Sequence, residues 1–128
     1  MSEPEWVDPS VVESFHYEQI REHGGIHGIR DQGMLESALG RPQQLYAYSS
    51  PDLCALAAAY AFGLAKNHPY LDGNKRTAAI TCELFLNLNG IEFIVDEVVK
   101  YPHYLDLASG EHTEESFAIW LRTVTRKF

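Results

Sequence analysis

Apolar residues are densest in the middle of the chain. Residues 53–66 are apolar on every side of a helix and rich in alanine. This pattern is typical of a helix at the buried centre of a domain. Asp52 stands before it, where an N-cap residue is favoured, and His68-Pro69 marks its end, because proline disfavours helix in the residue before it.

Two further helices are predicted before the central one. Asp8 is a candidate N-cap for a helix over residues 9–23, with proline at the first helical position and Gly24 at the end. Asp31 is a candidate N-cap for a short second helix, which is expected over residues 31–39. Residues 40–51 are expected to be irregular, apart from one helical turn.

Three helices are predicted after the central one. The first covers residues 74–88, and the second covers residues 96–109 with a break or restart at Pro102. Thr113 is expected to cap the last. Residues 91–95 form one short β-like run with few obvious partners.

These elements predict the fold class. The chain of 128 residues is expected to be one all-α domain over residues 1–128, with about six helices. Residues 24–30 contain three glycines and no helical period, so at most a short hairpin or flap is expected there.

The excess of acidic residues bears on whether the protein binds nucleic acid. The formal net charge is −8, which argues against a general nucleic-acid surface, because such a surface needs a basic face. A nucleotide site needs only a few local cations, and Lys75 and Arg76 are adjacent.

The sequence also predicts the cellular location of the protein and the role of its two cysteines. Residues 1–20 contain several acids and no apolar run, so no secretory leader is expected. The longest apolar stretch is too short to span a bilayer, so we predict a cytoplasmic protein without a membrane partner. Cys54 and Cys82 lie in apolar helical patterns and are expected to be small buried residues.

The loop between residues 68 and 76 carries the candidate chemistry. It opens directly into a helix, and a helix N-terminus attracts anions through free N–H groups and its dipole. Gly73 lets the backbone approach a phosphate closely. Lys75 and Arg76 add positive charge, and Asn74 is expected either to cap the helix or to donate a hydrogen bond to a ligand.

Two further side chains complete a transfer site. Asp72 offers a carboxylate of the kind that binds Mg²⁺ together with substrate phosphates. His68 has the side chain whose usual pKa suits a general base near neutrality. Simpler interpretations are that His68 only ends a helix and that Asp72-Gly73 is only a turn. The other histidines lack metal-ligand spacing and are expected to be surface or local residues: His16, His23, His27, His103 and His112.

Residues 68–77 read His-Pro-Tyr-Leu-Asp-Gly-Asn-Lys-Arg-Thr. This segment resembles the signature of the Fic/Doc family, most closely the Doc branch, which has lysine where Fic adenylyltransferases have a second glycine. The resemblance extends upstream through residues 24–42 and downstream through residues 85–90, so it covers nearly the whole chain. It implies a Fic-like helical domain.

The resemblance also implies an activity and partners. Doc-like toxins are kinases that use Mg-ATP to phosphorylate a threonine of a translation elongation factor, and a small antitoxin holds them in check. Carried over, His68 would be the base on a Ser/Thr hydroxyl of the protein target. Asp72 would hold Mg²⁺, and Tyr70 would anchor the loop in the core. Four residues would bind the phosphates: Gly73, Asn74, Lys75 and Arg76. Five residues would form the flap that docks the target: Gly25, Ile26, His27, Gly28 and Ile29.

Departures from the family pattern leave alternatives open. Many Fic enzymes have another arginine where this chain has Ala79. Residues 14–18 have the spacing of an inhibitory Fic helix, but Gln19 breaks that pattern, so self-inhibition is not predicted. The first alternative is a Fic-type adenylyltransferase that transfers AMP. The second is a catalytically weak module that binds a nucleotide or a peptide.

Overall fold

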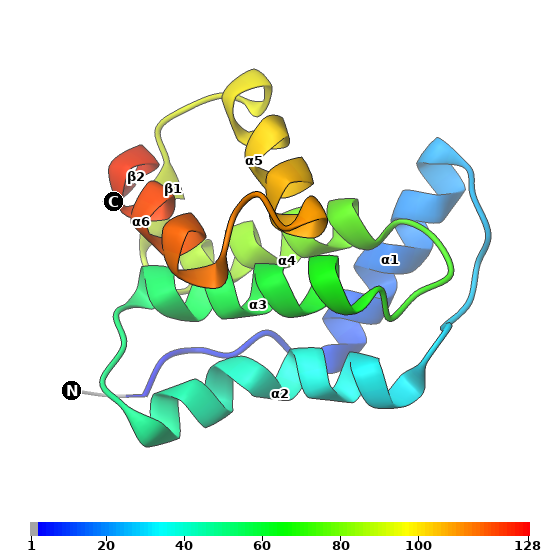
Figure 1. Ribbon diagram of the computed structural model, residues 1–128, viewed down its shortest axis with the longest axis horizontal. Coiled ribbons are helices and arrows are strands. Elements are labelled where there is room, and N and C mark those ends of the chain that lie inside the picture. Colours follow the sequence, from blue (N-terminus) through cyan, green and yellow to red (C-terminus); the bar gives the residue numbers. More distant parts are fainter. Residues whose placement is uncertain (1–2) are drawn as a thin grey trace.

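A computed structural model describes residues 3–128, which form six α-helices and one two-stranded sheet (Figure 1). The all-α prediction is confirmed. The elements in chain order are α1 (Pro9–His23), α2 (Gln32–Tyr48), α3 (Leu53–Asn67), α4 (Asn74–Leu88), β1 (Ile91–Phe93), α5 (Glu97–Ser109), α6 (Glu114–Val124) and β2 (Thr125–Lys127).

Helix α3 is the centre of the domain, as its apolar sequence predicts. It contacts α2, α4, α5 and α6, and it runs between α2 and the α5–α6 pair in Figure 1. Leu56 and Leu64 are fully buried, and each contributes about 1.5–3 kcal/mol by leaving water. The small residues allow close packing: a Cβ on Gly63 would lie 3.0 Å from the Cα of Ala38 in α2.

The predicted N-caps are confirmed. Asp8, Asp31, Asp52 and Thr113 each accept a hydrogen bond from a backbone N–H in the first turn of the helix that follows. Replacing such a cap with alanine typically costs about 1 kcal/mol. These residues therefore fix where α1, α2, α3 and α6 begin.

Two predictions about the extent of helices were wrong. Helix α2 continues through Pro42 to Tyr48, where an irregular segment was expected, and α5 continues through Pro102 without a break. A proline inside a helix removes one hydrogen bond and adds a steric clash. In α2 the ring of Pro42 is buried, and Leu45 and Tyr46 pack on the core beyond it. This burial favours continuing the helix.

The β-like run after α4 has its partner at the C-terminus. β1 pairs antiparallel with β2, with Ile91 opposite Lys127 and Phe93 opposite Thr125. The sequence of β2 is polar and directly follows α6, so it gave no strand pattern of its own. Within residues 3–128, no helix is long and apolar enough to cross a membrane.

Candidate functional site

The loop between α3 and α4 begins with a strained histidine. His68 has φ 47 and ψ 55, and it is the one residue other than glycine with a positive φ among residues 3–128. This left-handed conformation costs of order 1–3 kcal/mol, so surrounding contacts must hold it. The side chain of His68 is exposed, whereas Pro69 and Tyr70 are buried behind it.

Asn74 closes the loop on itself. Its amide oxygen accepts a hydrogen bond of 2.9 Å from the backbone N–H of Tyr70, and its amide nitrogen donates one of 3.0 Å to the Tyr70 carbonyl. Burial raises the pKa of the Tyr70 hydroxyl to about 12. The interpretation of Asn74 as a cap of α4 is wrong, because α4 has no side-chain cap. One amide hydrogen remains for a ligand, so a phosphate contact by Asn74 stays a prediction.

The N-terminus of α4 has the features of an anion site. Gly73 precedes the helix with φ 78 and ψ 16, a conformation that favours glycine. No side chain caps the first turn, and Lys75 and Arg76 are exposed there. Cations are unfavourable at the positive end of a helix dipole. Two cations at this end are therefore the arrangement expected of a site that binds an anion.

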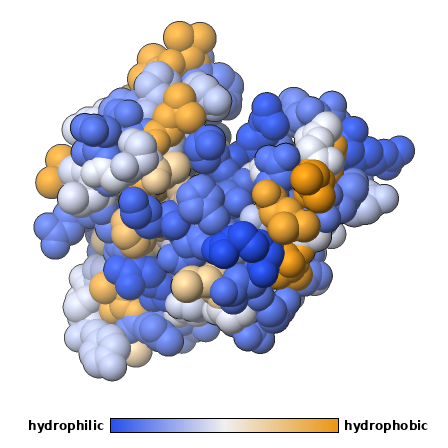
Figure 2. All heavy atoms as spheres, turned by 45° about the vertical axis from the view of Figure 1, so that its right-hand side comes forward, coloured by the Kyte–Doolittle hydropathy of each residue, from blue (hydrophilic) through white to orange (hydrophobic). Residues whose placement is uncertain are grey.

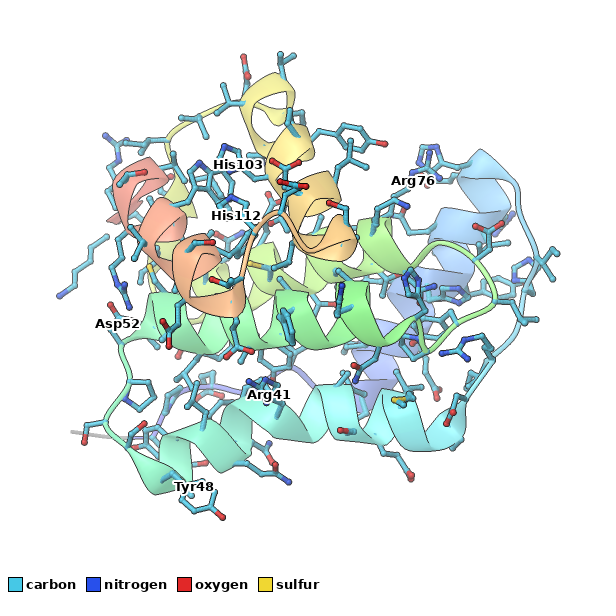
Figure 3. The ribbon with its side chains drawn as sticks, in the orientation of Figure 1. Arg41, Tyr48, Asp52, Arg76, His103 and His112 are labelled. Carbon is cyan, nitrogen blue, oxygen red and sulfur yellow. The ribbon has the colours of Figure 1, made fainter. Side chains whose placement is uncertain are left out.

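A cleft gathers these residues. It has a volume of about 310 Å³ and is lined by residues 68 and 71–76 together with Tyr101 of α5. A second cleft of about 480 Å³ adjoins it between α1, α4 and α5, sharing Lys75, Arg76 and Tyr101. Arg76 points into the gap between α5 and α1 (Figure 3). In Figure 2 the surface on this side of the molecule is mostly hydrophilic, with an apolar patch beside the polar residues.

The flap lies against the loop. The Leu71 N–H donates to the Gly28 carbonyl at 3.1 Å, and Ile29 forms a β-bridge with Tyr70. A Cβ on Gly25 would lie 2.6 Å from Oδ2 of Asp72. Ile26 is 64% exposed and His27 is also exposed. The structure therefore brings the predicted flap to the predicted loop, while docking of a target stays a prediction.

His16 was not predicted as part of this site. It was expected to be a surface or local residue, but it is buried, and its Nε2–H donates to the backbone carbonyl of Asp72 at 2.8 Å. The His16 ring also stacks on Tyr70, with centroids 3.7 Å apart. Val12, His16 and Ile20 share the buried face of α1 at four-residue spacing, which was the signal for an inward-facing histidine.

His103 and His112 form a local pair that ties α5 to α6. Nδ1 of His103 lies 2.8 Å from Nε2 of His112, and Nδ1 of His112 lies 2.7 Å from the Ser116 hydroxyl (Figure 3). The ring of His103 stacks on Trp120. Burial and the neighbouring His112 lower the pKa of His103. This pair is remote in sequence from the α3–α4 loop and lines neither of the two clefts.

Asp72 is the candidate ligand for a metal ion in this cleft. Among residues 3–128, no group of three or more His, Cys, Asp or Glu side chains could hold one. Asp72 contributes a single carboxylate, whose Oδ1 accepts a hydrogen bond of 2.9 Å from the Gly73 N–H. One carboxylate beside a phosphate site is the donor set that Mg²⁺ commonly uses with a nucleotide. The residues present therefore fit Mg²⁺ bound together with phosphates.

Comparisons with known proteins agree with this geometry. Residues 6–86 match the sequence profile of the Fic/DOC family. The chain is 34% identical over 110 residues to the protein kinase doc of Escherichia phage P1, covering 85% of this chain and 83% of that protein. It is 43% identical over 75 residues to the toxin Doc of Mycolicibacterium smegmatis, covering 57% of this chain and 58% of that protein.

Proposed function

Because this chain belongs to the Fic/DOC family, we propose that it transfers the γ-phosphate of Mg-ATP to a serine or threonine hydroxyl of another protein. One observation carries the proposal: an exposed histidine lies in the same cleft as an uncapped helix N-terminus that bears Lys75 and Arg76. A base and a phosphate site next to each other are the parts that phosphoryl transfer requires.

The start of α4 holds the phosphates in this proposal. The free N–H groups of its first turn attract an anion, and Gly73 allows a phosphate to approach the backbone. Lys75 and Arg76 neutralise the negative charge, with the planar guanidinium of Arg76 suited to two phosphate oxygens. Mg²⁺ held by Asp72 would neutralise charge that develops on the transferred phosphate.

His68 accepts the proton of the attacking hydroxyl. Its side chain is exposed at the cleft, so a target hydroxyl can reach it without rearrangement of the core. A positioned base of this kind typically contributes about 10²–10⁴-fold to the rate.

Lys75 favours the γ-phosphate as the group transferred. Glycine at this position would leave room for the β-phosphate at the helix N-terminus, whereas a lysine side chain there should block the β-phosphate. The nucleotide then binds in the reversed direction and presents its γ-phosphate to His68. Ala79 stands where the AMP-transferring relatives have a further arginine, so one of their phosphate contacts is missing.

We extend the proposal to the biological role. The two relatives are named a protein kinase and a toxin, and their similarity supports a Doc-like toxin. A translation elongation factor as the target follows only from the resemblance of residues 68–77 to the Doc branch. A small antitoxin would then bind and inhibit the chain. High-level expression of the unmutated chain alone should therefore arrest growth of a host that carries the target.

Two substitutions test the assigned roles. His68→Ala should leave Mg-ATP binding unchanged in a calorimetric titration but slow phosphate transfer by about 10²–10⁴-fold. Lys75→Ala should weaken both binding and transfer, because the lysine contacts the phosphates. Lys127→Ala, which removes an exposed lysine of β2, is the matched control and should change neither. If His68→Ala loses as much ATP affinity as Lys75→Ala, the histidine is a phosphate contact and the base lies elsewhere.

A further inference from the structure

Three successive backbone carbonyls at the C-terminal end of α3, those of residues 67–69, accept hydrogen bonds from the two residues that follow the flap. Nε of Arg30 donates to the His68 carbonyl at 2.6 Å, and Nη2 of Arg30 donates to the Asn67 carbonyl at 2.8 Å. The backbone N–H groups of Arg30 and Asp31 both donate to the Pro69 carbonyl, at 2.8 and 3.1 Å. Two adjacent residues therefore bind the whole turn in which His68 lies.

These hydrogen bonds stabilise a helix end that is otherwise unfavourable. The last carbonyls of a helix lack partners within the helix, and a helix commonly ends with glycine in the left-handed conformation. Here the left-handed residue is His68, whose Cβ makes that conformation costly. A guanidinium is suited to the turn because it offers a rigid pair of donors and a positive charge at the negative end of the helix dipole.

Arg30 is itself held in place. Asp31 caps α2, since its Oδ1 accepts a hydrogen bond of 3.0 Å from the Met34 N–H. The Arg30 backbone is fixed by its bond to the Pro69 carbonyl. Two of the guanidinium nitrogens are used on carbonyls of the protein, so the side chain is oriented toward the loop backbone.

We propose that Arg30 is a positioning residue for His68: it stabilises the left-handed turn that aims the imidazole into the cleft. The role of His68 as a base rests on the proposed function, but the conformational part of this inference does not. Arg30 acts on the backbone of the loop, so its loss should move His68 while leaving the phosphate contacts of α4 in place.

The experiment compares Arg30→Ala and Arg30→Lys with the control Arg126→Ala. Arg126 is an exposed arginine that pairs with Glu92 on the sheet, so its loss removes the same charge far from the loop. NMR spectra of the nucleotide-free protein follow the backbone signals of His68. Arg30→Ala should shift or broaden those signals, Arg30→Lys should do so less because one ammonium still reaches a carbonyl, and Arg126→Ala should leave them unchanged.

Turnover and binding supply the second measurement. With Mg-ATP, Arg30→Ala should lower kcat by about 10²-fold, a loss that a displacement near 1 Å can cause, with an unchanged dissociation constant for Mg-ATP. Added guanidinium ion at low millimolar concentration should restore part of the lost rate. Should Arg30→Ala fail to fold, Arg30→Lys provides the same comparison at smaller amplitude.

The outcomes separate this inference from the proposed function. Unchanged His68 signals in folded Arg30→Ala would overturn the inference whatever the activity. A weakened affinity for Mg-ATP with unchanged His68 signals would make Arg30 a ligand contact instead. If the unmutated chain transfers no phosphate, the proposed function fails, and the NMR comparison still decides whether Arg30 holds the turn.

Discussion

Replacing Gly25 with alanine should inactivate the site without unfolding the protein. A Cβ at this position would lie 2.6 Å from Oδ2 and 3.1 Å from Cγ of Asp72, whereas an ordinary contact is 3.4–4 Å. Because the Asp72 side chain is exposed, it can turn away from the new methyl group. The carboxylate would then leave the position from which it is proposed to hold Mg²⁺.

The expected magnitude follows from the distances. The carboxylate must move by roughly 0.8 Å, and a misplacement near 1 Å can cost about 10²-fold in rate. Alanine at a positive φ adds a folding cost of about 1–3 kcal/mol. Gly24 provides the matched control, because it also has a positive φ and a Cβ there would meet nothing within 4 Å.

The assay measures initial transfer rates over a range of Mg²⁺ concentrations, together with thermal unfolding. Both variants should unfold a few degrees below the unmutated chain. Only Gly25→Ala should lose about 10²-fold in rate and need more Mg²⁺. Equal activity losses in Gly24→Ala and Gly25→Ala would refute the reasoning, since they would trace the effect to strain rather than to Asp72.

Two further predictions concern contacts outside the motif. His16→Phe keeps a ring stacked on Tyr70 but loses the hydrogen bond to the Asp72 carbonyl. The free energy of unfolding should therefore fall by about 1 kcal/mol, and Mg²⁺-dependent transfer should fall as well. An unchanged dependence of the rate on Mg²⁺ would contradict this prediction. A hydrogen bond from the Arg122 guanidinium lowers the pKa of Asp52. The ionised Asp52 carboxylate therefore stabilises the fold at pH values above its usual pKa of about 3.9. This stabilisation is lost as the pH falls through the lowered pKa of the folded state. Asp52→Asn should therefore have a lower unfolding temperature than the unmutated chain at pH 7, but the same unfolding temperature in strong acid. A difference in unfolding temperature that persists in strong acid would exclude this dependence of stability on the Asp52 charge.

The sequence predicted the parts of the fold that local patterns determine. The apolar run of α3, the capping residues and the loop between α3 and α4 depend on neighbours in the chain, and each was predicted at its observed position. The continuation of α2 through Pro42 depends on burial of that ring, which a propensity argument cannot anticipate. The strand Thr125–Lys127 exists only because β1 lies beside it.

The candidate site divides in the same way. The motif from His68 to Arg76 is contiguous, so the sequence alone indicates its chemistry. The residues that orient it come from elsewhere: His16 lies 56 positions from the carbonyl it binds, and Arg30 lies 37 and 38 positions from the carbonyls it binds. The four-residue spacing of α1 indicates that His16 is buried. The carbonyls that His16 and Arg30 bind depend on the packing of α1 and residue 30 against the loop, which no local pattern specifies.

The central claim is that the γ-phosphate faces His68, and ATP labelled separately on its α- or γ-phosphate tests this most directly. The unmutated chain and His68→Ala are each incubated with Mg²⁺ and a cell lysate. We predict that γ-label is transferred to a protein by the unmutated chain, that His68→Ala transfers far less, and that α-label stays off protein in every sample. Transfer of α-label dependent on His68 would contradict the account and make the chain an adenylyltransferase.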